Sequence, residues 1–248
     1  LKLKKKYKFI KFYKNKKNYN YAYSLNLLIK KAKGKFIVFF DDDDISNSKR
    51  ISRLYNRLIT YEKKNNTNKV LIYSNRKVID KRKEIVHYEK LGIGRKSPEP
   101  HGIVVAEYIL KVLDKGTNFV WGEFGSCTLM SRLKFLKKIN GFDTKFDRCA
   151  ELDMAIKASF NNAHFISVNK PLITQNITNK PHKTLKKDLK ARFMLTNKYK
   201  KFLEKRNLYY LSLLNVYAWY WYQRKMNILG NIFRGFYYLL KFKNNFKL

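Results

Sequence analysis

Residues 34–44 read GKFIVFFDDDD, so four consecutive acids, Asp41 to Asp44, directly follow five apolar residues. The apolar run, residues 36–40, is short, aromatic and β-branched and follows a glycine, which predicts a buried strand. Four carboxylates at the end of a buried strand repel one another, and a divalent cation is their natural counter-charge. Mg²⁺ and Mn²⁺ take oxygen ligands and often bridge to phosphates. The stretch therefore favours a metal site; the alternative is a solvated acidic turn in which Asp44 or Ser46 caps the following helix.

The overall charge is strongly positive. The 248 residues include 55 Lys and Arg against 18 Asp and Glu, a formal net charge of +37. The basic residues are spread along the chain, so the charge favours anionic partners such as nucleotide phosphates, anionic lipid or nucleic acid without choosing among them. The length suggests one large domain, or one domain with an appendage, and 45% hydrophobic residues suffice for a core. Cys127 and Cys149 lack metal-site spacing, which makes a reducing compartment the default.

Strand-like and helix-like segments alternate through most of the chain. Strands are expected at residues 8–13, 36–40, 70–73, 76–80, 126–130 and 164–168. Helices are expected at residues 21–31, 50–62, 104–113, 134–139 and 151–159. Residues 90–102 carry three glycines and two prolines and are predicted as a loop. Strands interspersed with helices predict an α/β sheet with helices on its faces.

The character of the sequence changes near residue 184. Residues 185–205 are basic and helical, and residues 208–222 and 228–242 are aromatic and aliphatic. No window holds about 18 uninterrupted apolar residues, so no transmembrane helix is expected. One interpretation is a helical subdomain packed on a core formed by residues 1–183. The other is an interfacial anchor in residues 184–248, whose aromatic rings lie at headgroup depth: Tyr217, Trp219, Tyr220, Trp221 and Tyr222.

A second acidic site, Cys149-Ala150-Glu151-Leu152-Asp153, follows Gly141-Phe142-Asp143. Glu151 lies 108 residues after Asp43, so the two acidic sites can meet only through the fold. On a helix, Glu151 and Asp153 do not face the same way. Alone this site is weak, because an acid near a helix N-terminus usually compensates the helix dipole.

In combination the motifs resemble family 2 glycosyltransferases of the inverting GT-A type. The order is a glycine-led strand, an acidic DxD-type turn at Asp41–Asp44, a GGFDE-like segment at residues 141–143 and an ED-type motif at residues 150–153. Residues 120–130 look like a subgroup in which AEWD replaces the usual ED motif. The resemblance covers residues 8–175, and its motifs are specific only as a set.

The resemblance implies a GT-A fold, that is, a Rossmann-like mixed sheet flanked by helices, with a C-terminal helical appendage. It implies metal-dependent, inverting transfer of a sugar from a nucleotide-diphosphate donor, a UDP-sugar first among them, to a hydroxyl of a glycan or lipid-linked acceptor. Mn²⁺ or Mg²⁺ would be the cofactor. The setting implied is synthesis of a cell-surface polysaccharide or glycolipid, in the cytoplasm and at the inner face of an anionic membrane.

The resemblance also assigns roles. The donor-binding acids are Asp41, Asp42, Asp43 and Asp44. Asp43, with Asp41, is the expected metal ligand, in a register that four consecutive acids leave open by one residue. Glu151 is the expected catalytic base and Asp153 the second choice. Trp121 and Glu123 are expected in the acceptor pocket, with a core aromatic as the equal alternative for Trp121. His182 is a weaker candidate metal ligand, for which a surface loop is the simpler interpretation.

Two features depart from the family pattern and keep other functions open. Residues 8–13 match a later strand of the family, so the first third of the nucleotide-binding half is expected to be absent, and Glu151 stands where the ED motif has Asp. One alternative is therefore a truncated, inactive transferase that serves as a binding protein. A nucleic-acid-binding protein is favoured only by charge. It lacks any RRM, KH or zinc-finger pattern, so no nucleic-acid partner is expected.

Overall fold

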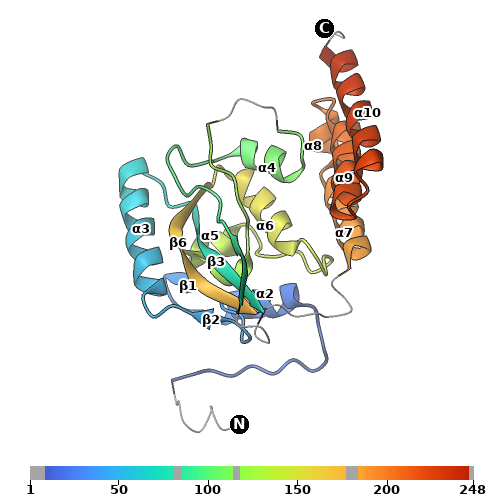
Figure 1. The fold of residues 1–248 in the computed structure, drawn as a ribbon. Coiled ribbons are helices and arrows are strands. Elements are labelled where there is room, and N and C mark those ends of the chain that lie inside the picture. Colours follow the sequence, from blue (N-terminus) through green and yellow to red (C-terminus); the bar gives the residue numbers. More distant parts are fainter. Residues whose placement is uncertain (1–8, 81–84, 114–117, 177–183, 246–248) are drawn as a thin grey trace.

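The computed structural model describes residues 9–80, 85–113, 118–176 and 184–245. Within these residues a mixed sheet lies at the centre, helices cover it, and four further helices stand beside it as a column (Figure 1). The expected α/β architecture with a C-terminal helical appendage is confirmed. His182 lies outside the described residues.

The sheet is organised around the long strand β3 (Val70–Asp80). β3 runs parallel to β6 (His164–Asn176) along most of its length. On its other side β3 pairs antiparallel with β5 (Met130–Arg132) and then with β4 (Ile85–Lys90). Residues 70–73 and 76–80, expected as separate strands, are thus one strand, because β6 accompanies both parts.

The four acids lie between the first and last strands of the sheet path. β1 (Phe36–Val38) pairs antiparallel with β5, and β2 (Ile45–Ser46) pairs antiparallel with β6. The strand order is β1-β5-β3-β6-β2, so the segment that joins β1 to β2 crosses the ends of the strands between them. The topology therefore carries Asp41–Asp44 to one end of the sheet.

Alternate residues of β3 face opposite layers, as the two-residue period of a strand requires. Val70 and Ile72 belong to a small core beneath α3 (Arg50–Asn65), whereas Leu71 and Tyr73 belong to the larger core. The larger core is covered by α2 (Tyr21–Lys31), α4 (Ile103–Ile109), α5 (Leu133–Lys138) and α6 (Ala150–Ser159). Helices therefore flank the sheet on both faces.

The C-terminal helices extend this larger core. They are α7 (Leu185–Lys198), α8 (Lys200–Glu204), α9 (Tyr209–Gln223) and α10 (Asn227–Asn245). Leu195 and Leu203 are buried in the same cluster as the sheet residues. Ser212 donates a hydrogen bond from Oγ to the Leu110 carbonyl oxygen at 2.7 Å. The helices are thus docked on the core, and no helix in the described part of the chain is long and apolar enough to cross a membrane.

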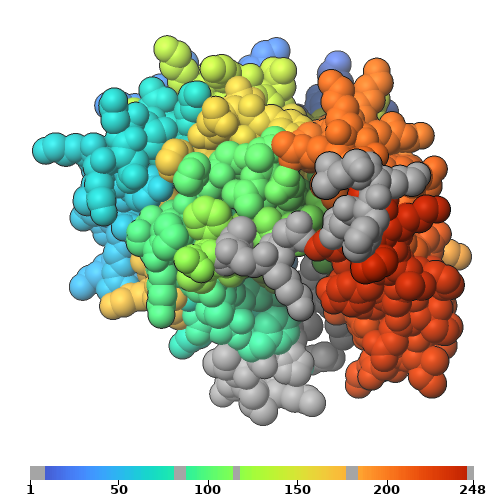
Figure 2. Space-filling view, turned by 90° about the horizontal axis from the view of Figure 1, so that it is seen from above, coloured from blue at the N-terminus to red at the C-terminus, as the bar shows by residue number. Residues whose placement is uncertain are grey.

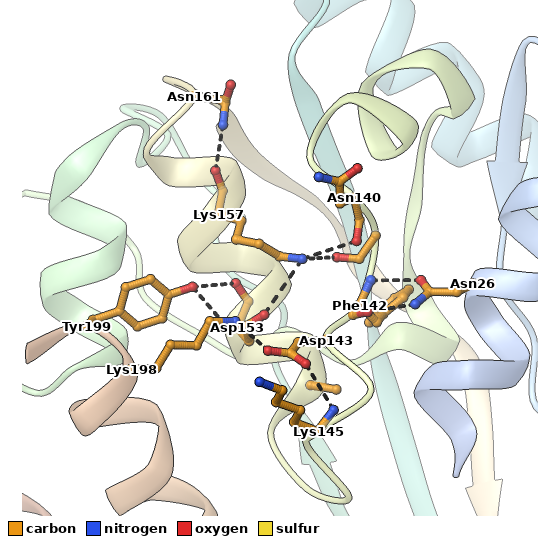
Figure 3. Close-up of polar contacts among 12 residues, drawn as sticks. Asn26, Asn140, Phe142, Asp143, Lys145, Asp153, Lys157, Asn161, Lys198 and Tyr199 are labelled. Carbon is orange, nitrogen blue, oxygen red and sulfur yellow. Dashed lines mark hydrogen bonds and ion pairs between the residues drawn. The ribbon is translucent and has the colours of Figure 1, made fainter. Parts of the chain in front are cut away.

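The strongest polar link to these helices is made by Asp153 of α6, whose side chain is fully buried (Figure 3). Its Oδ1 accepts from Lys198 Nζ at 2.6 Å and from the Tyr199 hydroxyl at 2.7 Å. Lys198 also reaches Asp143 Oδ2 at 2.7 Å. Asp143, of the GGFDE-like segment, therefore shares with Asp153 the task of holding α6 against α7.

Several element boundaries were predicted well and others were wrong. The helix at residues 21–31 is confirmed without change as α2, and Asn20 caps it by accepting from the Tyr23 amide at 3.0 Å. Residues 9–13 contain no strand, and Phe9 and Phe12 are 82% and 47% exposed, so their apolar side chains form no core. Residues 126–130 are mostly a 3₁₀ turn (Ser126–Thr128) rather than a strand.

The helix cap that was the alternative to a metal site is not formed. Neither Asp44 nor Ser46 caps α3, which has no side-chain cap; Asn47 Oδ1 accepts from the Lys49 amide at 2.9 Å in the turn before the helix. Asp44 is thereby released from the structural role that was the alternative to metal binding.

Asp153→Ala is expected to lower the free energy of unfolding by about 2–4 kcal/mol, because it leaves the buried Tyr199 hydroxyl and Lys198 without their shared acceptor. Urea denaturation measures this. Glu204→Ala is the matched control, since its pair with Lys200 at 3.5 Å is half exposed on both sides and is expected to contribute less than about 0.5 kcal/mol. Equal losses in the two variants would contradict a special role for Asp153.

Candidate active site

The acidic segment is held in place by a buried arginine. Arg50, at the start of α3, is 2% exposed and donates from Nη2 to the carbonyl oxygens of Phe39 and Cys127 at 2.7 and 2.5 Å. The Asp44 amide donates to the Asp41 carbonyl at 3.2 Å, which turns the chain back on itself. Arg50 therefore fixes the end of β1 against the 3₁₀ turn without forming an ion pair to any of the acids.

Asp44 is the acid that the fold leaves without a strong partner. Its side chain is 8% exposed, and neither carboxylate oxygen has a hydrogen-bond partner among the described residues, the weakly donating Cys127 thiol being nearby. Burial, together with repulsion from Asp41 and Asp43, raises the pKa of Asp44 to about 6. Burial and repulsion from Asp43 also raise the pKa of Asp41. The folded chain thus holds negative charge where a cation is needed.

Ligand atoms of Asp41, Asp44 and Cys127 lie within 4.8 Å of one another. Burial raises the pKa of the Cys127 thiol to about 11, so it stays protonated at neutral pH. A protonated thiol is a poor ligand for Mg²⁺ or Mn²⁺, whereas two carboxylates leave positions for substrate phosphates. The residues present therefore fit a hard cation held by Asp41 and Asp44.

This donor set differs by one residue from the expected pair of Asp43 and Asp41. The side chains of Asp42 and Asp43 are exposed. The backbone carbonyl of Asp43 accepts from Asn176 Nδ2 at 2.6 Å, which fixes the turn at the end of β6. The structure brings Asp41 and Asp44 together; donor contacts by Asp42 and Asp43 stay predictions.

A second arginine supplies positive charge beside the acids. Arg76, on β3, donates to Glu123 Oε2 at 2.8 Å and to Cys127 Sγ at 3.2 Å. Glu123 also pairs with Lys90 at 3.2 Å. A Cβ on Gly125 would lie 2.2 Å from Arg76 Nη1, so only glycine leaves room for this guanidinium. Glu123, expected in the acceptor pocket, is here the residue that orients Arg76.

Trp121 lies on the same loop as Glu123. Its ring stacks on Tyr108 with centroids 4.3 Å apart and planes at 16°, and it packs at the border of the larger core. Its carbonyl oxygen accepts from Arg95 at 3.1 Å. This position combines the two interpretations of Trp121, because one face is covered by the core and the residue is only partly buried.

Glu151 stands at the N-terminus of α6, and Tyr21 of α2 holds it there. The Tyr21 hydroxyl donates to Glu151 Oε2 and accepts from the Ala150 amide at 3.1 Å. Cys149, which precedes the helix, has a left-handed backbone with φ 66°. After burial and the neighbouring acids, the charge of Glu151 also contributes to the raised pKa of Asp41. The fold therefore brings the two acidic sites into one region, with Glu151 on the side of α6.

Asp153, the second choice as base, does not join this region. Its carboxylate is fully buried against Lys198 and Tyr199, two residues and about 200° of helical rotation from Glu151. That environment leaves no space for an acceptor hydroxyl, so the geometry favours Glu151 alone.

Three residues of this site were not found from the sequence: Tyr21, Arg76 and Cys127. Tyr21 carried no signal, because its contact to Glu151 spans 130 residues. Gly125, two residues before Cys127, was a usable signal for this loop. A glycine that follows an acid and an aromatic residue in a loop often marks a point where another group packs closely against the backbone.

The geometry agrees with comparisons to known proteins. The sequence pattern of the protein family described as Glycosyl transferase family 2 matches residues 1–154, which include both acidic sites. The chain belongs to this glycosyltransferase family. A comparison with curated protein sequences gives no match.

Among solved structures, S. aureus TarS 1–349 in complex with UDP-GlcNAc is similar, with a TM-score of 0.51 and 14% identity over 88% of this chain and 67% of that chain. S. aureus TarS 1–349 in complex with UDP aligns with a TM-score of 0.43 and 14% identity over 81% of this chain and 60% of that chain. At this identity the first likeness shows the fold, which is GT-A-like.

In metal-free protein, Asp44→Asn is expected to raise stability at pH 7.5 by on the order of 2 kcal/mol, because a native pKa of about 6 means that ionisation opposes folding. The native state binds the Asp44 proton more tightly than the unfolded chain, so this loss develops as pH rises from about 4 to 6 and is absent at pH 4. Thermal unfolding at both pH values measures it.

Mn²⁺ provides the complementary measurement. It is expected to stabilise the wild type and not Asp44→Asn, while the exposed Asp42→Asn should behave like the wild type in both respects. Equal stabilisation of all three proteins by Mn²⁺ would place the cation elsewhere.

Proposed function

We propose that the chain transfers a sugar, with inversion and with Mn²⁺ or Mg²⁺, from a nucleotide-diphosphate sugar to an acceptor hydroxyl. The observation that supports this most is Asp44, a buried carboxylate without a strong partner, beside Asp41 and in the same region as Glu151. A cation on Asp41 and Asp44 would stabilise the charge that develops on the leaving diphosphate.

Glu151 is the proposed catalytic base. Tyr21 occupies Glu151 Oε2, and Oε1 accepts no hydrogen bond within the described residues, so Oε1 is available to the acceptor hydroxyl. The acceptor oxygen bonds to the anomeric carbon as the carbon–oxygen bond to the diphosphate breaks on the opposite face. The hydroxyl proton passes to Glu151, and the electron pair of the broken bond leaves with the diphosphate.

The donor is proposed to be a UDP-sugar, in keeping with the UDP-GlcNAc named for the first TarS structure. The acceptor is proposed to be a glycan or lipid-linked glycan in the synthesis of a cell-surface polysaccharide or glycolipid. The competing function is an inactive, transferase-like binding protein, which the same experiment addresses.

Mn²⁺-dependent binding of UDP, measured by calorimetry, is expected for the wild type and for Glu151→Gln but not for Asp44→Asn. UDP release from a panel of UDP-sugars should fall by about 10²–10⁴-fold in Glu151→Gln, because only the proton acceptor is lost. GDP serves as the comparison nucleotide.

Binding without turnover in the wild type would support the inactive binding protein. A folded wild type that binds neither UDP nor GDP with Mn²⁺ would overturn the proposed donor site. Asp153→Asn is a further control: loss of UDP release without loss of stability in that variant would move the base from Glu151 to Asp153.

A specific observation also favours a membrane surface as partner. Four apolar residues on α10 are exposed at spacings of four, four and three: Ile228 at 78%, Ile232 at 47%, Phe236 at 54% and Leu239 at 68%. This spacing places them on one face of the helix. With a net charge of +37, the chain is suited to an anionic bilayer. We therefore propose a cytoplasmic location, peripheral at the inner face of the membrane.

The double variant Ile232→Asp/Leu239→Asp is expected to reduce co-sedimentation with phosphatidylglycerol vesicles at least about tenfold, because two exposed aliphatic side chains that would enter the bilayer are replaced by charges that anionic lipid repels. Ile51→Asp, at an exposed apolar position (62%) on α3, is the matched control and should bind normally. Unchanged vesicle binding, or a change only in oligomeric state, would contradict the membrane proposal.

A further inference from the structure

Two cations lie over the Trp219 ring where the C-terminal helices meet the core, and a third, Arg234, lies over the rings of Tyr237 and Tyr238 nearby. The Arg192 guanidinium lies 4.2 Å and Lys111 Nζ 5.8 Å from the centre of the Trp219 ring. Arg234 of α10 joins them through Asn215, which accepts from Arg234 Nη1 at 2.5 Å and donates to the Lys111 carbonyl at 2.6 Å. We call Lys111, Arg192, Trp219 and Arg234 the Trp219 cluster.

The cluster has no negative partner within the described chain. Its three cations form no ion pair there, and Arg192 Nε is buried without a hydrogen-bond acceptor. Asp188, one turn before Arg192 on α7, is already paired with Arg148 at 2.6 Å. Burial, with repulsion from Arg192 and Arg234, lowers the pKa of Lys111 to about 8. Positive charge is therefore concentrated where solvent is scarce, which is costly unless an anion binds.

Other basic residues of the C-terminal helices are neutralised, which makes the contrast informative. Lys198 pairs with Asp143 and Asp153, and Arg206 pairs with Glu107 of α4. The same interface thus supplies acids for some cations and none for the Trp219 cluster.

The cluster lies on the acceptor side of the proposed site. Asp188, one turn before Arg192, pairs at 2.6 Å with Arg148, which lies three residues before Glu151. Lys111 lies three residues after Tyr108, whose ring stacks on Trp121. The cluster is therefore close to the segment that leads into the proposed base and to the loop expected to contact the acceptor.

We propose that the Trp219 cluster binds a phosphate group of the acceptor, so that the acceptor is a phosphate-bearing glycan. This inference rests on the proposed function. Two guanidinium groups and an ammonium group match the charge and the several acceptor oxygens of a phosphate, and the Trp219 face offers a surface for an adjoining sugar ring. The phosphate belongs either to a phosphodiester within the glycan or to a diphosphate that links it to lipid.

Calorimetry with the full chain in the absence of divalent metal tests the site while the donor site is silent. The probes are glycerophosphoglycerol for a phosphodiester and farnesyl diphosphate for a lipid diphosphate, with glycerol and farnesol as their neutral counterparts. Tighter binding of one probe identifies the source of the phosphate.

Arg192→Gln and Lys111→Gln are each expected to raise the dissociation constant of the preferred probe at least tenfold. Lys200→Gln, which removes one charge from an exposed position on α8, should change it less than twofold. Lys111→Gln should also raise the midpoint of thermal unfolding, because it removes a partly buried charge that the neighbouring cations repel, so a folding defect does not obscure the result.

UDP binding with Mn²⁺ should be unchanged in both cluster variants. Normal UDP binding by the wild type with no phosphate binding, or with phosphate binding weakened equally by Lys200→Gln, would overturn the cluster proposal and leave the proposed function intact. A wild type that does not bind UDP with Mn²⁺ would instead contradict the proposed function on which the inference rests.

Discussion

The repulsion between Asp41 and Asp44 is the constraint around which this end of the sheet is built. Their carboxylates are close together at the end of a buried strand, and burial raises the pKa of both. Arg50 donates hydrogen bonds to the carbonyl oxygens of Phe39 and Cys127 and not to the acids. It therefore fixes the position of the acidic segment without neutralising the carboxylates by an ion pair. The fold thus tolerates local instability that a bound cation would relieve, a pattern typical of functional sites.

Arg76 offsets part of that charge, since it lowers the pKa of Asp41 and Asp44, but among the described residues its ion pair is with Glu123. The Arg76 guanidinium donates from Nη2 to Glu123, and the absence of a side chain at Gly125 leaves space for its Nη1. If Arg76 paired directly with Asp44, the acid would be satisfied and its affinity for a cation would fall. Glu123 therefore affects the charge of the acidic site without contacting it, because it holds Arg76. This role does not depend on any contact of Glu123 with a substrate.

Helix α6 carries two acids with different surroundings. Glu151 accepts from Tyr21 of α2, whereas Asp153 is buried in the interface with α7, because residues two apart on a helix face different ways. The buried partners of Asp153 belong to the C-terminal helices, so these helices help to set the position of the helix that carries Glu151. The appendage is thus mechanically connected to the proposed base.

The sequence allowed prediction of what depends on local pattern. The bounds of α2 follow from its capping Asn20 and apolar face, and the strand before the acids follows from its β-branched run. The identity of the paired acids did not follow, since four equal side chains differ only in how the turn between β1 and β2 buries them. The strand expected at residues 8–13 failed because its apolar residues find no layer to pack on, a property of the whole fold rather than of the segment.

The acidic site at Asp41 and Asp44 and the Trp219 cluster carry charges of opposite sign. At the proposed donor site the chain presents acids and would take a phosphate only through a cation, so a nucleotide diphosphate without its metal would be repelled there. At the Trp219 cluster the chain presents bare cations, for which metal-bound, charge-neutralised diphosphate is a weak ligand. This difference in the sign of the local charge would keep the two proposed phosphate-bearing substrates apart. Among the described residues, Arg192 and Lys111 form no ion pair, whereas Lys198 and Arg206 of the same interface do, and such a separation requires the former two to stay unpaired.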